Sequence, residues 1–420
     1  MDLKSKLRLH QNKKDDQKKS GEKKVEKRRE FSLPNLLPGK FVETEYGEFF
    51  LAEYRYSVDI CHGNYRLDKL IDQDLSALCG VLKNEGLICP EGIESLAFLD
   101  TETTGLAGGA GTYAFMVGLG YFEDQEFVLQ QYMMEDYPQE LAMMNALYEK
   151  LKDFSHLVTF NGKSFDWPLL KGRFIYHQMK KDLSFVHVDL LHPARRYYKR
   201  RLASCNLGSI EEEVLGFVRE NDIPGELVPE LFFSYVQDKD GRIIAPVFRH
   251  NHWDILSLTT LLTQLLQNYL QPTQILTEPE DIFSAGKVYE DLCQYSKAIK
   301  CYNNCLELKL PSYLEHESLE RLSFIYKRLE DFEQATSIWQ QFIDSGARKK
   351  LFPYIELAKY YEHRLKNYQK ALEMTRGAQD LLIQKRHFYD RDKFVKKREA
   401  LEHRQERLKK KISKAKARTS

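Results

Sequence analysis

The feature that most constrains the fold of this chain is a short apolar run that ends in closely spaced carboxylates. Residues 96–99 (LAFL) lead directly into the segment DTETTGL at 100–106. An uninterrupted apolar run that stops at polar residues is typical of a strand buried on both faces. Successive side chains of a strand point to opposite faces, so Asp100 and Glu102 point the same way and can bind one cation. The pattern predicts a sheet with two acidic ligands at the end of one strand.

Strand and helix patterns around this run predict a mixed sheet. We expect further strands at 113–121, 126–133, 156–160 and 185–190, and helices at about 138–152, 165–178 and 249–269. Residues 41–56 alternate in polarity around Gly47, as a β-hairpin does, and 66–83 are expected to be helical. Three adjacent strands followed by strands alternating with helices predict an α/β domain.

Beyond Pro272 the pattern changes to a helical repeat. Two aromatic residues and an alanine recur at Tyr289/Tyr295/Ala298, Tyr326/Phe332/Ala335 and Tyr361/Tyr368/Ala371, which places the alanines 37 and 36 residues apart. This period is typical of tetratricopeptide helix pairs, in which a small residue lets two helices approach closely. An unrelated helical bundle is the alternative, because the usual Trp-Leu-Gly-Tyr series is absent.

Charge and composition complete the expected domain organisation. We predict a disordered basic tail at 1–32, a β-hairpin and helix extension at 33–92, the α/β domain at 93–271, all-α tetratricopeptide-like repeats at 272–384 and a basic tail at 385–420. The net charge of +1 is the sum of +6 in residues 1–30, +10 in 385–420 and −15 between them. Basic ends can contact a polyanion, although a solvated tail has the same composition.

Composition also excludes several classes of protein. No apolar run approaches the roughly 20 residues of a membrane helix, and no signal peptide is recognisable, so we expect a cytoplasmic protein without membrane contact. Seven cysteines with no CxxC pair argue against a disulfide framework and against a structural zinc site.

Further candidate ligands follow two later elements. Asp166 lies at the expected start of a helix in NGKSFDWPLL, and Asp254 lies four residues after His250 in HNHWD, on the same helix face. Carboxylate oxygens suit Mg²⁺ or Mn²⁺, and a two-metal site needs more than one acidic pair. His250 is then a candidate general base. Helix capping by Asp166 and a structural His–Asp salt bridge are the alternatives.

These segments resemble a known family. In the same order, they are similar to the DEDD superfamily of 3′→5′ exonucleases, whose fold is ribonuclease H-like. DTETTGLAGGAGTYAFMVGLGYF, LVTFNGKSFDWPLL and HNHWDILSL look like the YprB family, which is represented by the mitomycin repair factor exonuclease of Gram-positive bacteria. ETEYGEFF and DICHG also resemble it, so the similarity spans about residues 33–270. The helical part resembles the family more loosely.

The resemblance implies a metal site and a reaction. It assigns the ligands of two divalent ions to Asp100, Glu102, Asp166 and Asp254, and it favours DNA over RNA as substrate, in damage repair beside a helicase. One departure concerns the base. The histidine branch of the superfamily has its base five residues before the last aspartate, where this chain has Arg249. The tyrosine branch has a tyrosine four residues before, which is His250 here, whereas His252 is expected to be structural.

Substrate contacts are expected around the carboxylates. The backbone of Thr103, Thr104, Gly105 and Leu106 can approach a bound strand, and Asn161, Lys163 and Arg173 flank Asp166. The segment RRYYKRR at 195–201 suits phosphate contacts with base stacking on its tyrosines, or is a solvated basic loop. A ribonuclease with the same site, and a catalytically idle adaptor whose repeats do the work, are the competing functions.

Overall fold

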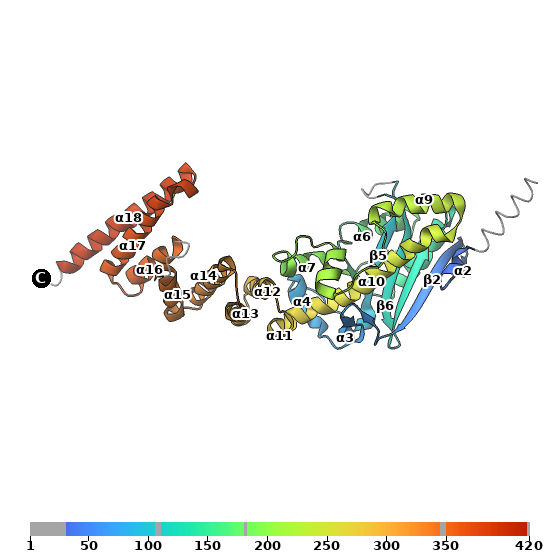
Figure 1. Cartoon of the computed structure of the whole chain (residues 1–420), viewed down its shortest axis with the longest axis horizontal. Coiled ribbons are helices and arrows are strands. Elements are labelled where there is room, and N and C mark those ends of the chain that lie inside the picture. The colour runs from blue at the N-terminus through green and yellow to red at the C-terminus, as the bar shows by residue number, and fades with distance from the viewer. Residues whose placement is uncertain (1–30, 106–110, 180–182, 345–349, 418–420) are drawn as a thin grey trace, which may run out of the picture. The chain divides into compact units, whose positions relative to one another are not determined.

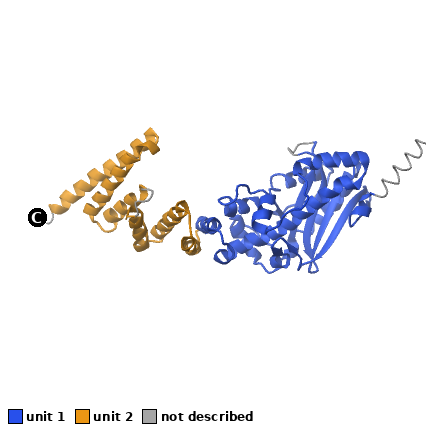
Figure 2. Ribbon diagram, viewed as in Figure 1, with its two compact units in different colours: residues 1–292 blue, residues 293–420 orange. Residues whose placement is uncertain are grey.

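The computed structural model describes residues 31–105, 111–179, 183–344 and 350–417, so the basic segment 1–30 lies outside the described residues. The chain forms two compact units, residues 1–292 and 293–420 (Figure 2). This boundary lies 21 residues beyond the predicted one, because α12 (Pro279–Asp291) packs on α7 (Leu191–Tyr198) of the first unit. An ion pair between Arg201 and the buried Asp281 (2.9 Å) fixes this packing.

Seven strands of the described chain form one mixed sheet, in the order β1-β2-β7-β6-β5-β8-β9 (Figure 1). Their bounds are β1 Gly39–Thr44, β2 Gly47–Ser57, β5 Leu96–Thr103, β6 Ala114–Glu123, β7 Glu126–Met133, β8 His156–Thr159 and β9 Val186–Asp189. Strands β1, β2, β7, β6 and β5 are antiparallel neighbours, and β5, β8 and β9 are parallel. The predicted α/β class is confirmed. The hairpin extends the sheet, because β2 pairs with β7 along its length.

Short and long helices complete the first unit. Besides α7 and α12 they are α2 Leu33–Leu36, α3 Asp68–Ile71, α4 Leu78–Leu82, α5 Glu140–Leu151, α6 Asp166–Tyr176, α8 Leu207–Ile210, α9 Val228–Asp238, α10 Gly241–Leu270 and α11 Pro272–Ile275; a small hairpin joins β3 Cys61–His62 to β4 Tyr65–Arg66. The helix predicted at 66–83 is broken into α3, α4 and a 3-10 turn. Helix α10 begins earlier than predicted, where the Asp240 side chain caps the Arg242 amide (3.1 Å). No helix of the described residues is long and apolar enough to cross a membrane.

Helices α5 and α10 cover opposite faces of the sheet. On the α5 face, Lys150 lies over the ring of Tyr121. On the α10 face, two glycines of β6 let the helix approach closely. A Cβ atom at Gly118 would lie 2.3 Å from Asn251 Oδ1, and one at Gly120 would lie 2.5 Å from Ile255 Cγ2. This close approach brings the middle of α10 against the acidic end of β5.

The second unit is entirely helical over its described residues, as predicted. Its helices are α13 Tyr295–Glu307, α14 Ser312–Arg328, α15 Phe332–Asp344, α16 Phe352–His363, α17 Tyr368–Gln384 and α18 Arg391–Lys416. The repeated alanines Ala298, Ala335 and Ala371 lie on α13, α15 and α17, and each is 0% exposed. Their burial fits the close helix crossing for which the repeat pattern selects small residues.

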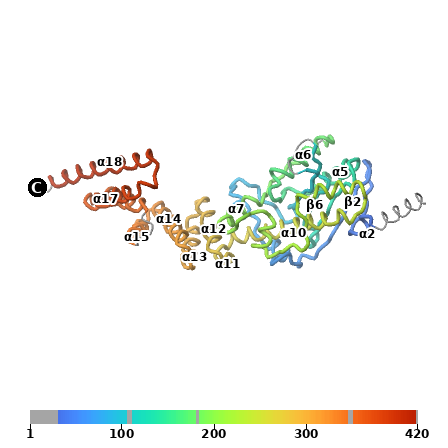
Figure 3. The backbone as a smooth tube through the Cα atoms, turned by 45° about the horizontal axis from the view of Figure 1, so that its top comes forward, coloured from blue at the N-terminus to red at the C-terminus, as the bar shows by residue number. Residues whose placement is uncertain are grey.

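The segment expected to be a basic C-terminal tail is instead a packed helix. Helix α18 runs beside α17 (Figure 3), with Leu401 and Leu408 buried. These leucines lie seven residues apart and so occupy one helix face, a spacing that the many lysines and arginines obscure in the sequence. On the same helix, Arg404 and Arg407 bind Glu362 of α16 at 2.8 and 2.9 Å. Part of the basic charge therefore stabilises the unit internally.

Candidate active site

Two acidic residues of β5 face helix α10, as their alternation predicts. The side-chain amide of Asn251 donates a hydrogen bond to Asp100 Oδ2 (2.9 Å), and Asn251 is itself fully buried. Glu102 lies one pleat further along the same face and is 8% exposed. The strand thus holds both carboxylates under α10, where the helix supplies their neighbours.

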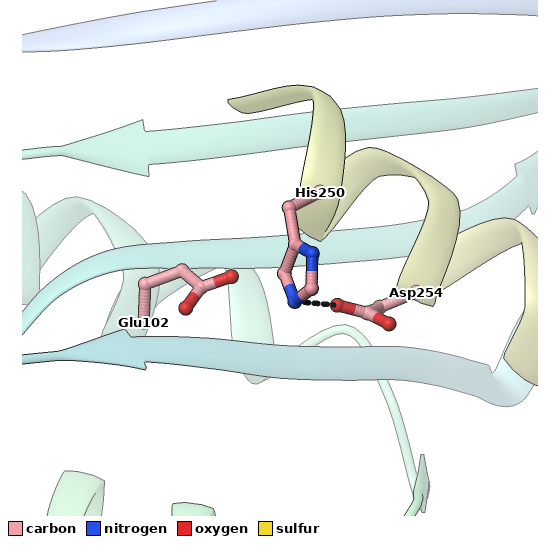
Figure 4. A group of neighbouring side chains, drawn as sticks. All are labelled: Glu102, His250 and Asp254. Atoms are coloured by element: carbon pink, nitrogen blue, oxygen red, sulfur yellow. Dashed lines mark ion pairs between the residues drawn. The ribbon is translucent and has the colours of Figure 1, made fainter. Parts of the chain in front are cut away.

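Helix α10 adds a histidine and a third carboxylate to this pair. Donor atoms of Glu102, His250 and Asp254 all lie within 4.8 Å of one another, a spacing that one metal ion can bridge. Figure 4 shows His250 and Asp254 on successive turns of α10, both pointing toward Glu102 on the strand. Nε2 of His250 lies 3.5 Å from Asp254 Oδ2.

A fourth carboxylate comes from the start of α6. Asp166 is the first residue of this helix, and its Oδ1 accepts a hydrogen bond from the hydroxyl of Thr101 on β5. The turn before it requires glycine, because a Cβ atom at Gly162 would lie 2.7 Å from Asp166 Oδ2 and 2.6 Å from Thr159 Cβ. The parallel pairing of β5 with β8 brings this turn to the acidic end of β5.

The carboxylates repel one another in a poorly solvated place. Burial, together with the charges of Asp254, Glu102 and Asp166, raises the pKa of Asp100 well above its ordinary range. Burial raises the pKa of Glu102 to about 8 against the opposing attraction of His250, and burial also raises that of Asp166. Such a cluster is costly unless a cation neutralises it.

The donor set fits a divalent cation. The oxygen Oε1 of Glu102 is buried and has no hydrogen-bond partner among the described residues. A buried carboxylate oxygen without a donor calls for a ligand in a folded protein. Hard oxygen donors of this kind, in a cluster with four carboxylates, are the ligands that Mg²⁺ and Mn²⁺ take.

His250 is held in one orientation by a carboxylate behind it. Both oxygens of Asp222 lie 2.9 Å from His250 Nδ1, which leaves Nε2 directed toward Asp254. Burial lowers the pKa of His250, but the charges of Asp254, Glu102 and Asp222 outweigh it and the net shift is upward. A ring fixed at one nitrogen and presented at the other is the arrangement that proton-transfer histidines require.

Comparison with known proteins identifies the family. The model of the ribonuclease H superfamily matches residues 97–266, which include all four carboxylates and His250. The uncharacterized protein YprB of Bacillus subtilis (strain 168) is 32% identical over 341 residues, which are 79% of this chain and 80% of that protein. The chain belongs to the YprB family. Members of the ribonuclease H superfamily are nucleases and typically use divalent metal ions, and Glu102, His250 and Asp254 are a candidate site for one.

An arginine that sequence reasoning missed balances the site of this YprB family member. Arg219 forms ion pairs with Asp254 (2.5 Å), Glu211 (2.6 Å) and Asp222 (3.1 Å). Burial acts to lower the pKa of Arg219, but these attractions outweigh it and raise the pKa above its ordinary value. The guanidinium is therefore a permanent cation beside the cluster. Arg219 and Asp222 lie in an irregular segment between α8 and α9, where no periodicity signals a role.

Two other site residues left a weak signal in the sequence. Asn251 lies inside the HNHWD motif and Asp189 ends a strand predicted from its apolar pattern. Asp189 accepts hydrogen bonds from the amides of Asn161 (2.8 Å) and Lys163 (3.2 Å), which shapes the turn before Asp166. Asn161 takes a positive φ of 67° in this turn. The Lys163 side chain is exposed beside it.

The segment after Glu102 is ordered by its own side chains. Thr103 Oγ1 donates to the Gly105 carbonyl (2.9 Å), and Thr104 exchanges hydrogen bonds with the backbone of Tyr113 at 2.9 and 3.0 Å. A β-bulge between Glu102 and Thr103 re-aims this end of the strand. Leu106, the last of the expected substrate contacts here, lies outside the described residues.

Two expectations about substrate contacts do not fit the structure. Arg173 is 7% exposed, and its guanidinium binds the buried Glu140 (2.5 Å). It also lies over the ring of Tyr113, so its contacts are with the interior of the first unit. Tyr197 and Tyr198 are each 1% exposed, so neither ring can stack on a base. They lie on a helix, not on a basic loop, and helical spacing turns both toward the interior. His252 also packs internally, against Tyr56 Oη (2.9 Å), as expected.

Proposed function

We propose that this protein is a metal-dependent 3′→5′ exonuclease that hydrolyses DNA. The observation that carries the proposal is the convergence of Asp100, Glu102, Asp166 and Asp254 from three elements, with a buried Glu102 oxygen that has no hydrogen-bond donor among the described residues. In a purely structural ion-pair network, a cationic side chain would bind that Glu102 oxygen. Arg219 binds Asp254 instead.

The residues divide into those that hold cations and those that move a proton. In this proposal Asp100, Glu102 and Asp254 would hold one divalent ion, and Asp100 with Asp166 would hold a second. When bound, such a pair lowers the pKa of a water molecule and stabilises the charge on the leaving 3′ oxygen. His250 Nε2 accepts the proton of the attacking water, while the Asp222 carboxylate holds the opposite nitrogen at 2.9 Å.

The rest of the chain supports this chemistry. In this proposal the exposed Lys163 and the backbone of Thr103–Gly105 contact the terminal nucleotides. The helical unit presents the kind of surface with which repeat proteins bind partners, and we assign to it the recruitment of a helicase or another repair protein. DNA is preferred to RNA because of the family resemblance.

End-labelled strands test the proposal directly. Purified full-length protein is incubated with matched DNA and RNA strands in Mg²⁺, in Mn²⁺ and in EDTA. We expect DNA to be shortened in either metal and to stay intact in EDTA. Faster shortening of RNA would assign the same site to a ribonuclease. No shortening of either strand in any metal would refute the nuclease and favour the idle adaptor.

A further inference from the structure

A basic pocket lies in the first unit, apart from the carboxylate cluster. Its volume is about 390 Å³, and it is formed by residues at the end of α4 and along α7 and α12. Its charged lining residues are the cations Lys83, Arg195, Arg196, Lys199, Arg200 and Lys287 and the single carboxylate Asp291. The net charge of this lining is six minus one, or +5.

The charge of the pocket contrasts with its surroundings. Residues 31–384 sum to −15, so six cations around one cavity are a local concentration that average composition does not produce. Lys83 is neutralised by its ion pair with Asp291. In the part of the chain that the structure describes, Arg195 and Lys199 form no salt bridge and are exposed. Arg196 is half-buried and donates to the Val81 carbonyl (2.8 Å), which fixes its guanidinium.

The pocket is connected to the active site through two helices. Helix α7 begins two residues after Asp189, which orders the turn before Asp166 at the carboxyl edge of the sheet. At the other end of α7, Tyr198 Oη accepts a hydrogen bond from Asn268 of α10 (2.7 Å). Asn268 lies 14 residues beyond Asp254 on the same helix, which at 1.5 Å per residue is about 21 Å.

We propose that this pocket binds backbone phosphates of the nucleic-acid substrate, away from the end being cleaved. The inference rests on the proposed function for the position of that end. Phosphates are the fitting ligand because the pocket offers several cations, and because the buried Tyr197 and Tyr198 leave no ring for a base. Contacts of this kind position a strand without reading its sequence. An acidic protein segment is the other polyanion that six cations can attract, and its binding is an outcome of the test.

A double charge-removal variant tests the pocket. Arg195→Gln with Lys199→Gln removes two exposed cations that form no salt bridge within the described residues, so folding is preserved. Binding of a labelled single strand is measured in EDTA across a salt series. Each lost phosphate contact reduces the slope of log affinity against log salt by about 0.7, so the double variant should lose about 1.4. The matched control, Lys40→Gln with Lys69→Gln, removes two cations of β1 and α3 that form no salt bridge within the described residues, and should leave the slope unchanged.

Strand length provides a second measurement. In Mg²⁺ the double variant should raise KM for long strands and leave unchanged the cleavage of strands too short to reach the pocket from the active site. An unchanged salt slope in a variant whose wild-type parent binds the strand overturns the pocket proposal. The proposal is also overturned if the wild-type protein binds a polyglutamate peptide and the double variant does not, while the affinity of the variant for the strand stays intact. Wild-type protein that binds strands but cleaves none refutes the proposed function alone, because the salt slope is measured without catalysis.

Discussion

Asp100 is the site residue that most directly lowers the stability of the metal-free fold. Its carboxylate lies near three others, and burial together with their charges raises its pKa, while the side-chain amide of Asn251 donates a hydrogen bond to it. Repulsion between neighbouring carboxylates costs folding free energy until a cation is bound. The side chain is therefore held in a place where it destabilises the metal-free fold.

The substitution Asp100→Asn removes this charge and keeps an oxygen for Asn251. We expect nuclease activity to be lost and the melting temperature in EDTA to rise, because the repulsion is relieved. Mg²⁺ should raise the melting temperature of the wild-type protein and have little effect on the variant. A variant that keeps wild-type turnover, measured on labelled strands, would contradict the assignment of Asp100 as a ligand.

The two histidines of α10 allow a matched comparison. His250→Ala should lower the cleavage rate by about 10²–10⁴-fold, the usual contribution of general base catalysis. His252 packs on the rings of Tyr54 and Tyr56, and burial lowers its pKa to about 4, so it stays neutral. His252→Ala should therefore reduce stability and leave the rate of the folded protein nearly unchanged. The reverse result, measured in single turnovers, would exclude His250 as the base.

At the scale of elements, a buried carboxylate of α16 binds helix α18 within the second unit. Glu362 is 2% exposed and accepts hydrogen bonds from Arg404 (2.8 Å), Arg407 (2.9 Å) and Lys411 (2.9 Å). Burial acts to raise the pKa of Glu362, but the bonds from Arg407 and Lys411 outweigh it and lower the pKa to about 2. The ionised form is therefore the one that stabilises the fold.

This lowered pKa predicts a pH dependence of stability. The contribution of Glu362 is fully present above its ordinary pKa of 4.5 and is lost as the pH falls toward about 2. Glu362→Gln should lower the melting temperature of the second unit at pH 7, and the gap to the wild type should close between pH 4.5 and 2. A gap that stays constant over this window in calorimetry would show that the charge of Glu362 contributes nothing.

The repeat alanines give a second prediction for these helices. Ala335 is 0% exposed and lies in a cluster with Trp339 and Leu357. Ala335→Leu should overpack this contact and cost about 1–3 kcal/mol of unfolding free energy, measured by urea denaturation. The first unit has its own core. Cleavage of short strands should survive, while partner recruitment and processive action on long strands decline. Equal loss on short and long strands would contradict a separate role for the repeats.

The sequence predicted the elements whose patterns are local. Strands β6 and β7 and the alternation of Asp100 and Glu102 follow from apolar runs and side-chain period, and the structure confirms both strands. Helix α18 was not predicted, because apolar residues such as Leu401 and Leu408 are few among its many cations and the helix depends on packing against α17. Arg219 and Asp222 were missed because their roles arise from contacts with α10, about 30 residues away along the chain, that no local pattern encodes.

At the scale of the whole molecule, acidic and basic side chains gather at different places. Acidic side chains gather at the end of β5 and basic ones around the pocket of α7, although both lie within the first unit. A negatively charged strand is repelled by an acidic cluster unless cations are bound there, and it is attracted by a basic surface nearby. This distribution suits an enzyme that holds a polyanion at one place and cleaves its end at another.

The direction of cleavage tests the central claim most directly. The same DNA strand is labelled at its 5′ end or at its 3′ end and incubated with the full-length protein in Mg²⁺. The 5′ label should move through a ladder of progressively shorter strands, and the 3′ label should be released at once as a mononucleotide. Asp166→Asn, which alters a proposed ligand at the start of α6, should abolish both patterns. Release of the 5′ label first, or internal fragments at early times, would contradict a 3′→5′ exonuclease.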